Sequence, residues 1–177
     1  MIWSAEFQEG DKVISLTKAL AKFFRLSLGG GSEFTTIEEE LDHVRQYLII
    51  QKMRYEDKLN YTITCEDGLE RTKIPKLILQ PIVENALYHG IRPKEEPGTI
   101  TIKAERSGEK ILFTIADDGV GYDPDAPEKG ISKGSGVGQD NVDRRIKLRY
   151  GEGHGVSVAS TIGSGTTVTI IIGTEAG

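Results

Sequence analysis

Residues 79–90 read Leu-Gln-Pro-Ile-Val-Glu-Asn-Ala-Leu-Tyr-His-Gly. The apolar residues of this stretch recur at helical spacing and predict an amphipathic helix with one buried face. Pro75 and Lys76 are expected near its start, and Gly90 is expected to end it. The polar residues of the stretch, which are Glu84, Asn85, Tyr88 and His89, are therefore candidates for chemistry at the surface of a core.

Two glycine-containing motifs follow this helix. Asp117-Asp118-Gly119-Val120-Gly121 comes directly after an apolar strand, and Gly134-Ser135-Gly136-Val137-Gly138 comes before another helix. Each motif alone has an ordinary explanation, because Asp-Gly is a common turn and linkers are rich in glycine. In this order the three elements resemble the nucleotide site of the Bergerat fold, which histidine kinases, gyrase-type topoisomerases and Hsp90-like chaperones share.

The composition is that of a globular protein without a general affinity for nucleic acid or membrane. The chain has 177 residues and a formal net charge of −5, which gives no electrostatic reason to bind nucleic acid. No apolar run approaches the roughly 18 residues of a membrane helix. Cys65 is the single cysteine, so an intrachain disulfide is excluded. We expect a cytoplasmic domain that reaches a membrane only through segments upstream of it.

The first 57 residues predict two helices. Apolar residues at helical spacing indicate a helix over 11–28 and a second one to about Tyr55. Thr36 with Glu39 three residues later is a capping box, which places the start of the second helix. A helical hairpin cannot bury both apolar stripes alone, so we expect a homodimer that forms a four-helix bundle.

From residue 58 onward the pattern predicts a mixed sheet with helices on one face. The expected strands cover residues 59–65, 99–105, 110–116, 156–159 and 166–172, and a basic helix is expected over 141–150 with Val142, Ile146 and Leu148 inward. The long Gly/Pro-rich stretch over 119–139 is typical of a lid or binding loop. We predict an α+β protein, a two-layer α/β sandwich at 58–177 preceded by a partial antiparallel hairpin at 1–57.

The candidate site residues suggest binding of a nucleotide with a metal ion. The amide oxygen of Asn85 can coordinate Mg²⁺, which usually takes one or two protein oxygens beside substrate phosphates. Glu84 can orient a water on that metal, or it can be a solvated helix residue. The Asp117 carboxylate can accept a hydrogen bond from the exocyclic amine of adenine, and Gly119 and Gly121 allow the purine to approach the main chain.

The second glycine motif is a candidate phosphate cradle. Gly134, Gly136 and Gly138 precede a helix whose N-terminal amides can hold phosphate oxygens. Lys129 and Lys133 can neutralise phosphate charge or can be ordinary solvated lysines. A P-loop is excluded because no G-x-x-x-x-G-K-[ST] occurs.

Nearly the whole chain resembles LytS/YesM-type bacterial sensor histidine kinases. Residues 79–90 are similar to their N-box, residues 117–121 to their adenine-binding box, and residues 134–138 with Asn141 to their lid box. The resemblance implies ATP and Mg²⁺ as cofactors, with Tyr88, His89, Val137 and Asn141 also at the nucleotide. It further implies transfer of the γ-phosphoryl group to a histidine, and then to an aspartate of a response-regulator receiver domain.

The sequence departs from this family in two places. The Asn-Pro-His-Phe-Leu motif of the phosphoacceptor is absent, which implies a kinase core downstream of its own acceptor, and His43 is interpreted as a bundle-surface histidine. Tyr88 stands where many relatives carry a phosphate-facing lysine, so Arg92 or the lid can take that role.

Two alternative functions stay open. One is a nucleotide-sensing interaction module without phosphotransfer. The other is a gyrase-like ATPase, which Pro81 disfavours because ATP-hydrolysing relatives carry a glutamate four residues before the asparagine.

Overall fold

The computed structural model describes residues 10–28, 32–123 and 135–174, and it describes no side chains for residues 27, 28 and 135–137. Within these ranges, the sheet has five strands: β2 (Leu59–Cys65), β4 (Gly98–Ser107), β5 (Lys110–Asp117), β6 (Gly155–Thr161) and β7 (Gly165–Gly173). Their spatial order is β2-β4-β5-β7-β6. Strand β2 is parallel to β4, and every other neighbouring pair is antiparallel, so the predicted mixed sheet is confirmed.

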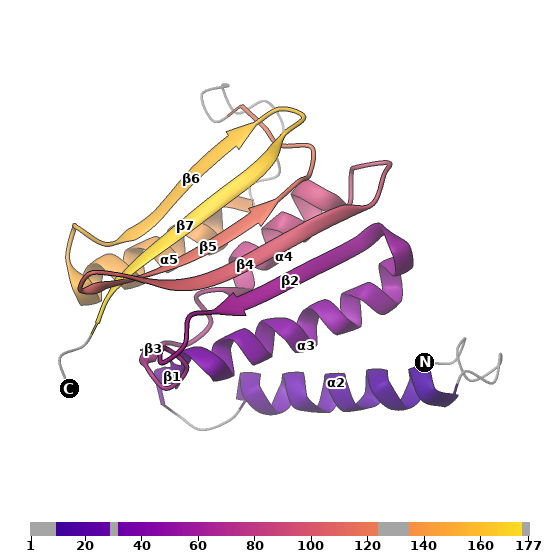
Figure 1. The fold of residues 1–177 in the computed structure, drawn as a ribbon, viewed down its shortest axis with the longest axis horizontal. Helices are drawn as coiled ribbons and strands as arrows, with labels where there is room; N and C mark the ends of the chain where they lie inside the picture. Colours follow the sequence, from indigo (N-terminus) through magenta and orange to yellow (C-terminus); the bar gives the residue numbers. More distant parts are fainter. Residues whose placement is uncertain (1–9, 29–31, 124–134, 175–177) are drawn as a thin grey trace.

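One face of this sheet is buried beneath helices. Along β5 the side chains of Ile111, Phe113 and Ile115 are buried, whereas those between them are only half-buried, as period-2 alternation requires. Helix α4 (Gln80–Asn85), a π-helical continuation η2 (Ala86–Ile91) and helix α5 (Ser135–Tyr150) cover the buried face. Figure 1 shows α4 and α5 behind the sheet, which is the predicted two-layer arrangement.

Helix α3 (Ile37–Tyr55) starts at the predicted capping box. The Thr36 hydroxyl accepts the N–H of Glu39 at 3.2 Å, and the Glu39 carboxylate accepts the N–H of Thr36 at 3.0 Å. The apolar stripe of α3 is fully buried in the same core as the sheet, as Val44 and Leu48 show. Because the sheet layer covers this stripe, α3 does not need partner helices to bury it.

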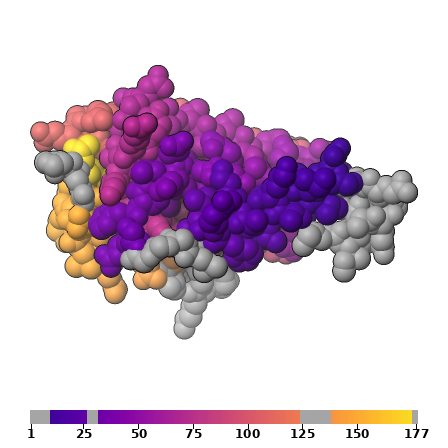
Figure 2. All heavy atoms as spheres, turned by 90° about the horizontal axis from the view of Figure 1, so that it is seen from below, coloured from indigo at the N-terminus to yellow at the C-terminus, as the bar shows by residue number. Residues whose placement is uncertain are grey.

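Helix α2 (Gly10–Leu28) lies on the outer side of α3, and Figures 1 and 2 show it along the lower face of the molecule. His43 of α3 stacks on Phe23 of α2, with ring centroids 4.6 Å apart, and is only 3% exposed. Burial lowers the pKa of this imidazole. The interpretation of His43 as a surface histidine is therefore wrong.

Other expectations need correction. The helix expected from Pro75 begins at Gln80, because residues 73–75 form a short strand β3 that pairs with β1 (Phe34–Thr36). The prediction that Leu148 faces inward is wrong, because its side chain is 81% exposed, whereas Val142 and Ile146 are buried as predicted. None of the helices in the described ranges is long and apolar enough to cross a membrane.

Candidate functional site

The helix expected over 79–90 changes its hydrogen-bonding pattern in the middle. Helix α4 ends at Asn85, and residues 86–91 continue as the π-helical turn η2, in which the N–H of Arg92 reaches the carbonyl of Leu87 at 2.8 Å. Gly90 therefore does not end the helical segment. Short π-helical insertions are frequent at functional sites, because they displace the backbone locally.

Gly90 lies directly against the carboxylate of Asp117. A Cβ atom at position 90 would overlap Oδ1 of Asp117, so a residue with a side chain could not occupy this position without a shift. The sequence does not predict this role, because glycine at the end of a predicted helix has a sufficient explanation as a stop. The close approach of two distant segments becomes visible only in the fold.

Asp117 is the last residue of β5 and is 7% exposed. Its Oδ1 accepts the backbone N–H of Gly119 at 2.9 Å. Burial raises the pKa of this carboxyl to about 6, against the lowering effect of the backbone N–H groups of Gly119 and Thr166. The carboxylate is thus held by backbone donors at the end of the sheet, beside η2.

The turn after Asp117 packs on η2 and on the β6–β7 hairpin. The N–H of Val120 donates to the carbonyl of Gly90 at 3.1 Å, and the N–H of Gly163 donates to the carbonyl of Val120 at 2.7 Å. A Cβ at Gly119 would overlap the backbone of Gly90, and one at Gly121 would overlap the carbonyl of Thr161. Both predicted glycines are therefore required for close backbone contact.

The neighbouring carboxylate, Asp118, has a structural environment. It is exposed, and its Oδ1 accepts the backbone N–H of Thr99 at 2.8 Å. The Lys94 ammonium lies 3.4 Å from the same oxygen. These contacts fasten the loop before β4 to the end of β5.

The polar residues of α4 and η2 differ in exposure. Glu84 and Asn85 are half-buried, and the Glu84 carboxylate accepts the side-chain amide of Gln80 at 2.8 Å. Tyr88 is half-buried with the Arg92 guanidinium 6.0 Å from its ring centroid, whereas His89 is exposed. Arg92 thus places a cation beside Tyr88. Position 88 is the one at which the resemblance leads us to expect a lysine.

The second glycine motif lies at the start of α5. Its helix begins at Ser135 instead of Asn141, so Gly136, Val137 and Gly138 are helical residues. Gly138 faces Pro81 of α4, since a Cβ at Gly138 would lie 3.2 Å from the Cβ of Pro81. Asn141 is exposed. Gly134, Lys129 and Lys133 lie outside the described residues.

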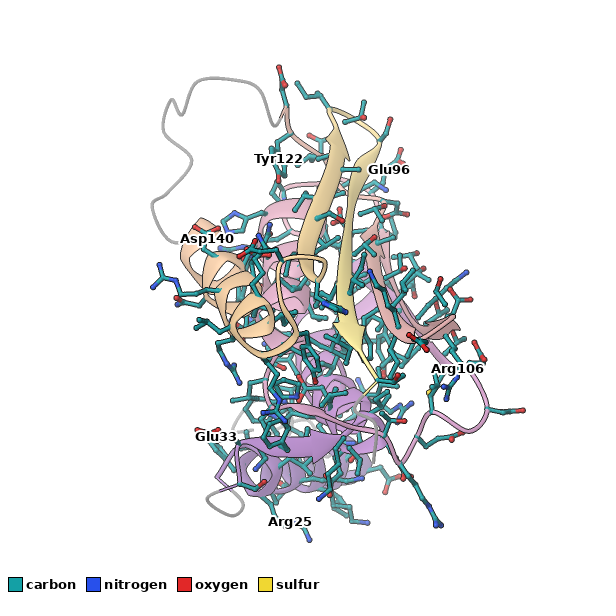
Figure 3. All side chains as sticks on the ribbon, turned by 90° about the vertical axis from the view of Figure 1, so that its left-hand side faces the viewer. Arg25, Glu33, Glu96, Arg106, Tyr122 and Asp140 are labelled. Carbon is teal, nitrogen blue, oxygen red and sulfur yellow. The ribbon has the colours of Figure 1, made fainter. Side chains whose placement is uncertain are left out.

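The α4–η2 segment therefore connects the predicted motifs. It contacts the start of α5 through Pro81 and the end of β5 through Gly90, and Asn85 lies between these two contacts. Figure 3 shows Tyr122 and Asp140, which follow the two glycine motifs, far from Arg25 and Glu33 at the opposite end of the molecule.

Glu40 is a buried acidic residue that the sequence pattern does not distinguish from its neighbours. It is 2% exposed, and its two oxygens accept the backbone N–H groups of Leu77 at 2.9 Å and Leu79 at 3.0 Å. Burial raises the pKa of this carboxyl. The run of three glutamates at 38–40 gave no sign that its last member is inside the fold, because acidic residues are common in the first turn of a helix.

Comparison with known families identifies two matching regions. Residues 71–176 match the family described as histidine kinase-, DNA gyrase B- and HSP90-like ATPase. Residues 1–59 match the family described as histidine kinase.

Individual relatives agree with this assignment. The chain is 34% identical over 163 residues to the sensor histidine kinase BtsS of Escherichia coli K12, covering 92% of this chain and 28% of that protein. It is 33% identical over 170 residues to the sensor histidine kinase YesM of Bacillus subtilis 168, covering 96% of this chain and 29% of that protein. The chain thus spans less than a third of the length of either relative.

Solved structures show the same fold. The histidine kinase domain of the blue-light activated histidine kinase of Erythrobacter litoralis EL346 superposes with a TM-score of 0.57 at 20% identity, covering 92% of this chain and 75% of that one. The catalytic domain of the histidine kinase ThkA superposes with a TM-score of 0.59 at 17% identity, covering 81% and 99%. This chain therefore belongs to the histidine kinase-, DNA gyrase B- and HSP90-like ATPase family, and its relatives within that family are sensor histidine kinases.

Proposed function

We propose that this chain is the ATP-binding catalytic core of a two-component sensor histidine kinase. It would transfer the γ-phosphoryl group of ATP to a histidine outside this sequence, from which the group passes to an aspartate of a response-regulator receiver domain. The family match and the sensor kinases among the relatives support this function. The observation that carries it is the contact of Gly90 and Gly119 around the buried Asp117 carboxylate.

The residues present fit a purine and a magnesium ion. Asp117 offers an acceptor at the end of a strand, and the glycines at 90 and 119 let the backbone of η2 and of the following turn pack closely around it. Described residues include no cluster of three His, Cys, Asp or Glu side chains that would form an all-protein metal cage. Mg²⁺ held mainly by phosphates does not need such a cage, because one or two protein oxygens suffice.

Each proposed site residue then has a distinct task. Asp117 accepts a hydrogen bond from the exocyclic amine of adenine, and Gly119 and Gly121 keep the main chain close to the base. Asn85 supplies an amide oxygen to Mg²⁺, and Glu84 orients water there. Bound Mg²⁺ neutralises phosphate charge, which favours transfer to a nucleophile. Residues 134–138 with Asn141 would face the phosphates, and Tyr88 and His89 would flank them.

Pro81 supports transfer over hydrolysis. It occupies the position four residues before Asn85, where a glutamate would activate water in gyrase-like relatives. Imidazole is already a good nucleophile at neutral pH, so a kinase that phosphorylates histidine does not need a general base at this position.

The experiment that tests this function is titration calorimetry of the chain with a non-hydrolysable Mg-ATP analogue. We expect binding by the wild type and a loss of about 100-fold in affinity for Asp117→Asn, because the amide opposes one donor with another. Asp118→Asn is the matched control and should change affinity little. Absence of binding by the wild type, or equal affinity of the Asp117→Asn variant, contradicts the proposal.

A nucleotide-sensing module without phosphotransfer is the second candidate, because the base contact proposed for Asp117 would serve binding alone equally well. A polypeptide bearing the family's phosphoacceptor helix, mixed with this chain and labelled ATP, separates the two functions. Phosphohistidine formation supports the kinase, whereas bound but unconsumed ATP supports the module.

The assembly and location of the kinase are also proposals. Ile14 and Phe24 of α2 are half exposed, at 53% and 52%, and would be covered by a second copy in a homodimer formed through the N-terminal helices. We propose 1–57 as a partial dimerisation hairpin and 58–177 as the ATP-binding domain, with α3 packed on that domain as a connecting helix. The kinase core would be cytoplasmic, within a parent protein anchored to the membrane.

A further inference from the structure

The start of α4 is held by a carboxylate from another helix. Leu79 occupies the N-cap position of α4, and its apolar side chain makes no capping hydrogen bond. Glu40 of α3 substitutes for the missing cap. One of its oxygens accepts the N–H of Leu79 at 3.0 Å, and the other accepts the N–H of Leu77 at 2.9 Å.

The backbone that Glu40 holds has an unfavourable conformation. Leu77 has a φ of +58°, in the left-handed region, which costs a residue with a Cβ about 1–2 kcal/mol. On the other side, the Arg145 guanidinium of α5 donates to the carbonyl of Lys76 at 2.9 Å. Residues 76–79 are therefore tied to both α3 and α5, and Glu40 supplies the buried part of that connection.

Helix α3 also packs against the next part of the α4–η2 segment. Seven residues after Glu40, on the same face of α3, Tyr47 is 7% exposed and lies beside Tyr88 and Glu84. Burial, together with these two neighbours, raises the pKa of Tyr47. The side of the α4–η2 segment that carries Glu84 and Tyr88 is thus packed on α3. Asp117, in contrast, is held by Gly90, Gly119 and the sheet.

We propose that Glu40 is a positioning residue for the metal–phosphate end of the nucleotide site. By fixing the backbone where α4 begins, it sets where Asn85 stands relative to Asp117. This inference rests on the proposed function of the site. Its consequence is a different effect on two ligands. Loss of the Glu40 carboxylate weakens binding of magnesium-bound ATP and leaves binding of adenosine unchanged.

The test compares two ligands in calorimetry on the full 177-residue chain. In Glu40→Gln, an amide NH₂ replaces one acceptor oxygen and opposes a backbone N–H. We expect affinity for a non-hydrolysable Mg-ATP analogue to fall about 10-fold, as for other supporting contacts to metal ligands, with adenosine affinity within about twofold of wild type. Glu38→Gln, an exposed glutamate in the same turn, is the matched control and should change neither affinity.

The two-ligand comparison separates positioning from general destabilisation. Equal losses for adenosine and the Mg-ATP analogue, or no loss for either, overturn the proposal for Glu40. Glu40→Ala should show the same difference between the two ligands more strongly, and if this variant does not fold, the Glu40→Gln result decides. Failure of the wild type to bind either ligand contradicts the proposed function itself and is thereby distinguishable.

Discussion

Among the described residues, the buried carboxylates are Asp117 at the end of β5 and Glu40 near the start of α3, and their surroundings differ. Burial raises the pKa of both. Both oxygens of Glu40 accept backbone N–H groups of one neighbouring segment. Asp117 instead borders the Cα of Gly90, where no side chain separates it from the α4–η2 segment. Glu40 thus holds one backbone segment through two hydrogen bonds, whereas the glycine beside Asp117 lets that carboxylate lie directly against the backbone of η2.

The strongest test of the Asp117 surroundings is Gly119→Ala. The new Cβ would overlap the backbone of Gly90, which cannot move as a flexible side chain would, so we expect the free energy of unfolding to fall by about 3 kcal/mol. Urea unfolding measures this change. Gly153→Ala is the control, since the nearest atom to its Cβ would be the Lys110 Nζ at 3.9 Å. A loss below about 1 kcal/mol in Gly119→Ala would show that the contact is loose.

The second test concerns the charge of Asp117. Because its pKa is raised to about 6, the carboxylate that accepts the adenine amine is ionised above pH 6 and is progressively protonated below it. We expect adenosine to bind about 10-fold more weakly at pH 5 than at pH 7.5, since about one-tenth of the carboxyl is ionised one unit below its pKa. Adenosine is used because it carries no titrating phosphate.

The folded protein should show the same titration in its stability. Between about pH 4 and pH 6, folded Asp117 retains a proton that the unfolded chain has lost, so its contribution to the free energy of unfolding falls as pH rises. Wild type compared with Asp117→Asn by urea unfolding should show this fall. If the free energies of unfolding of the two proteins differ by the same amount at every pH, the raised pKa of Asp117 is contradicted.

The smallest expected effect lies on the α3 side of the comparison. Thr36→Ala removes the hydroxyl that accepts the N–H of Glu39, and loss of such a cap costs about 1 kcal/mol. Thermal unfolding measures it, with Glu38→Gln in the same turn as the control. If α3 serves mainly to hold α4 through Glu40, adenosine affinity should remain that of the wild type in Thr36→Ala. A parallel fall in adenosine affinity would mean that α3 also supports the Asp117 end.

Local patterns predicted most of the elements correctly. The capping box of Thr36 and Glu39, the five strands and the buried positions Val142 and Ile146 all follow from side-chain periodicity and from short-range hydrogen bonding. The wrong expectations concern boundaries and faces. The apolar character of Leu148 predicts an inward position on the same helix, although the face that carries Val142 and Ile146 leaves position 148 outside.

The sequence by itself determined the strands, the order of the motifs and the identity of Asp117, Gly119 and Asn85 as candidate residues, because these depend on neighbours within a few positions. Tertiary structure decided that Gly90 contacts Asp117, that Gly138 faces Pro81, and that Glu40 caps a helix 39 residues further along the chain. Contacts between segments far apart in sequence depend on how the layers pack, and no local pattern specifies where two such segments meet.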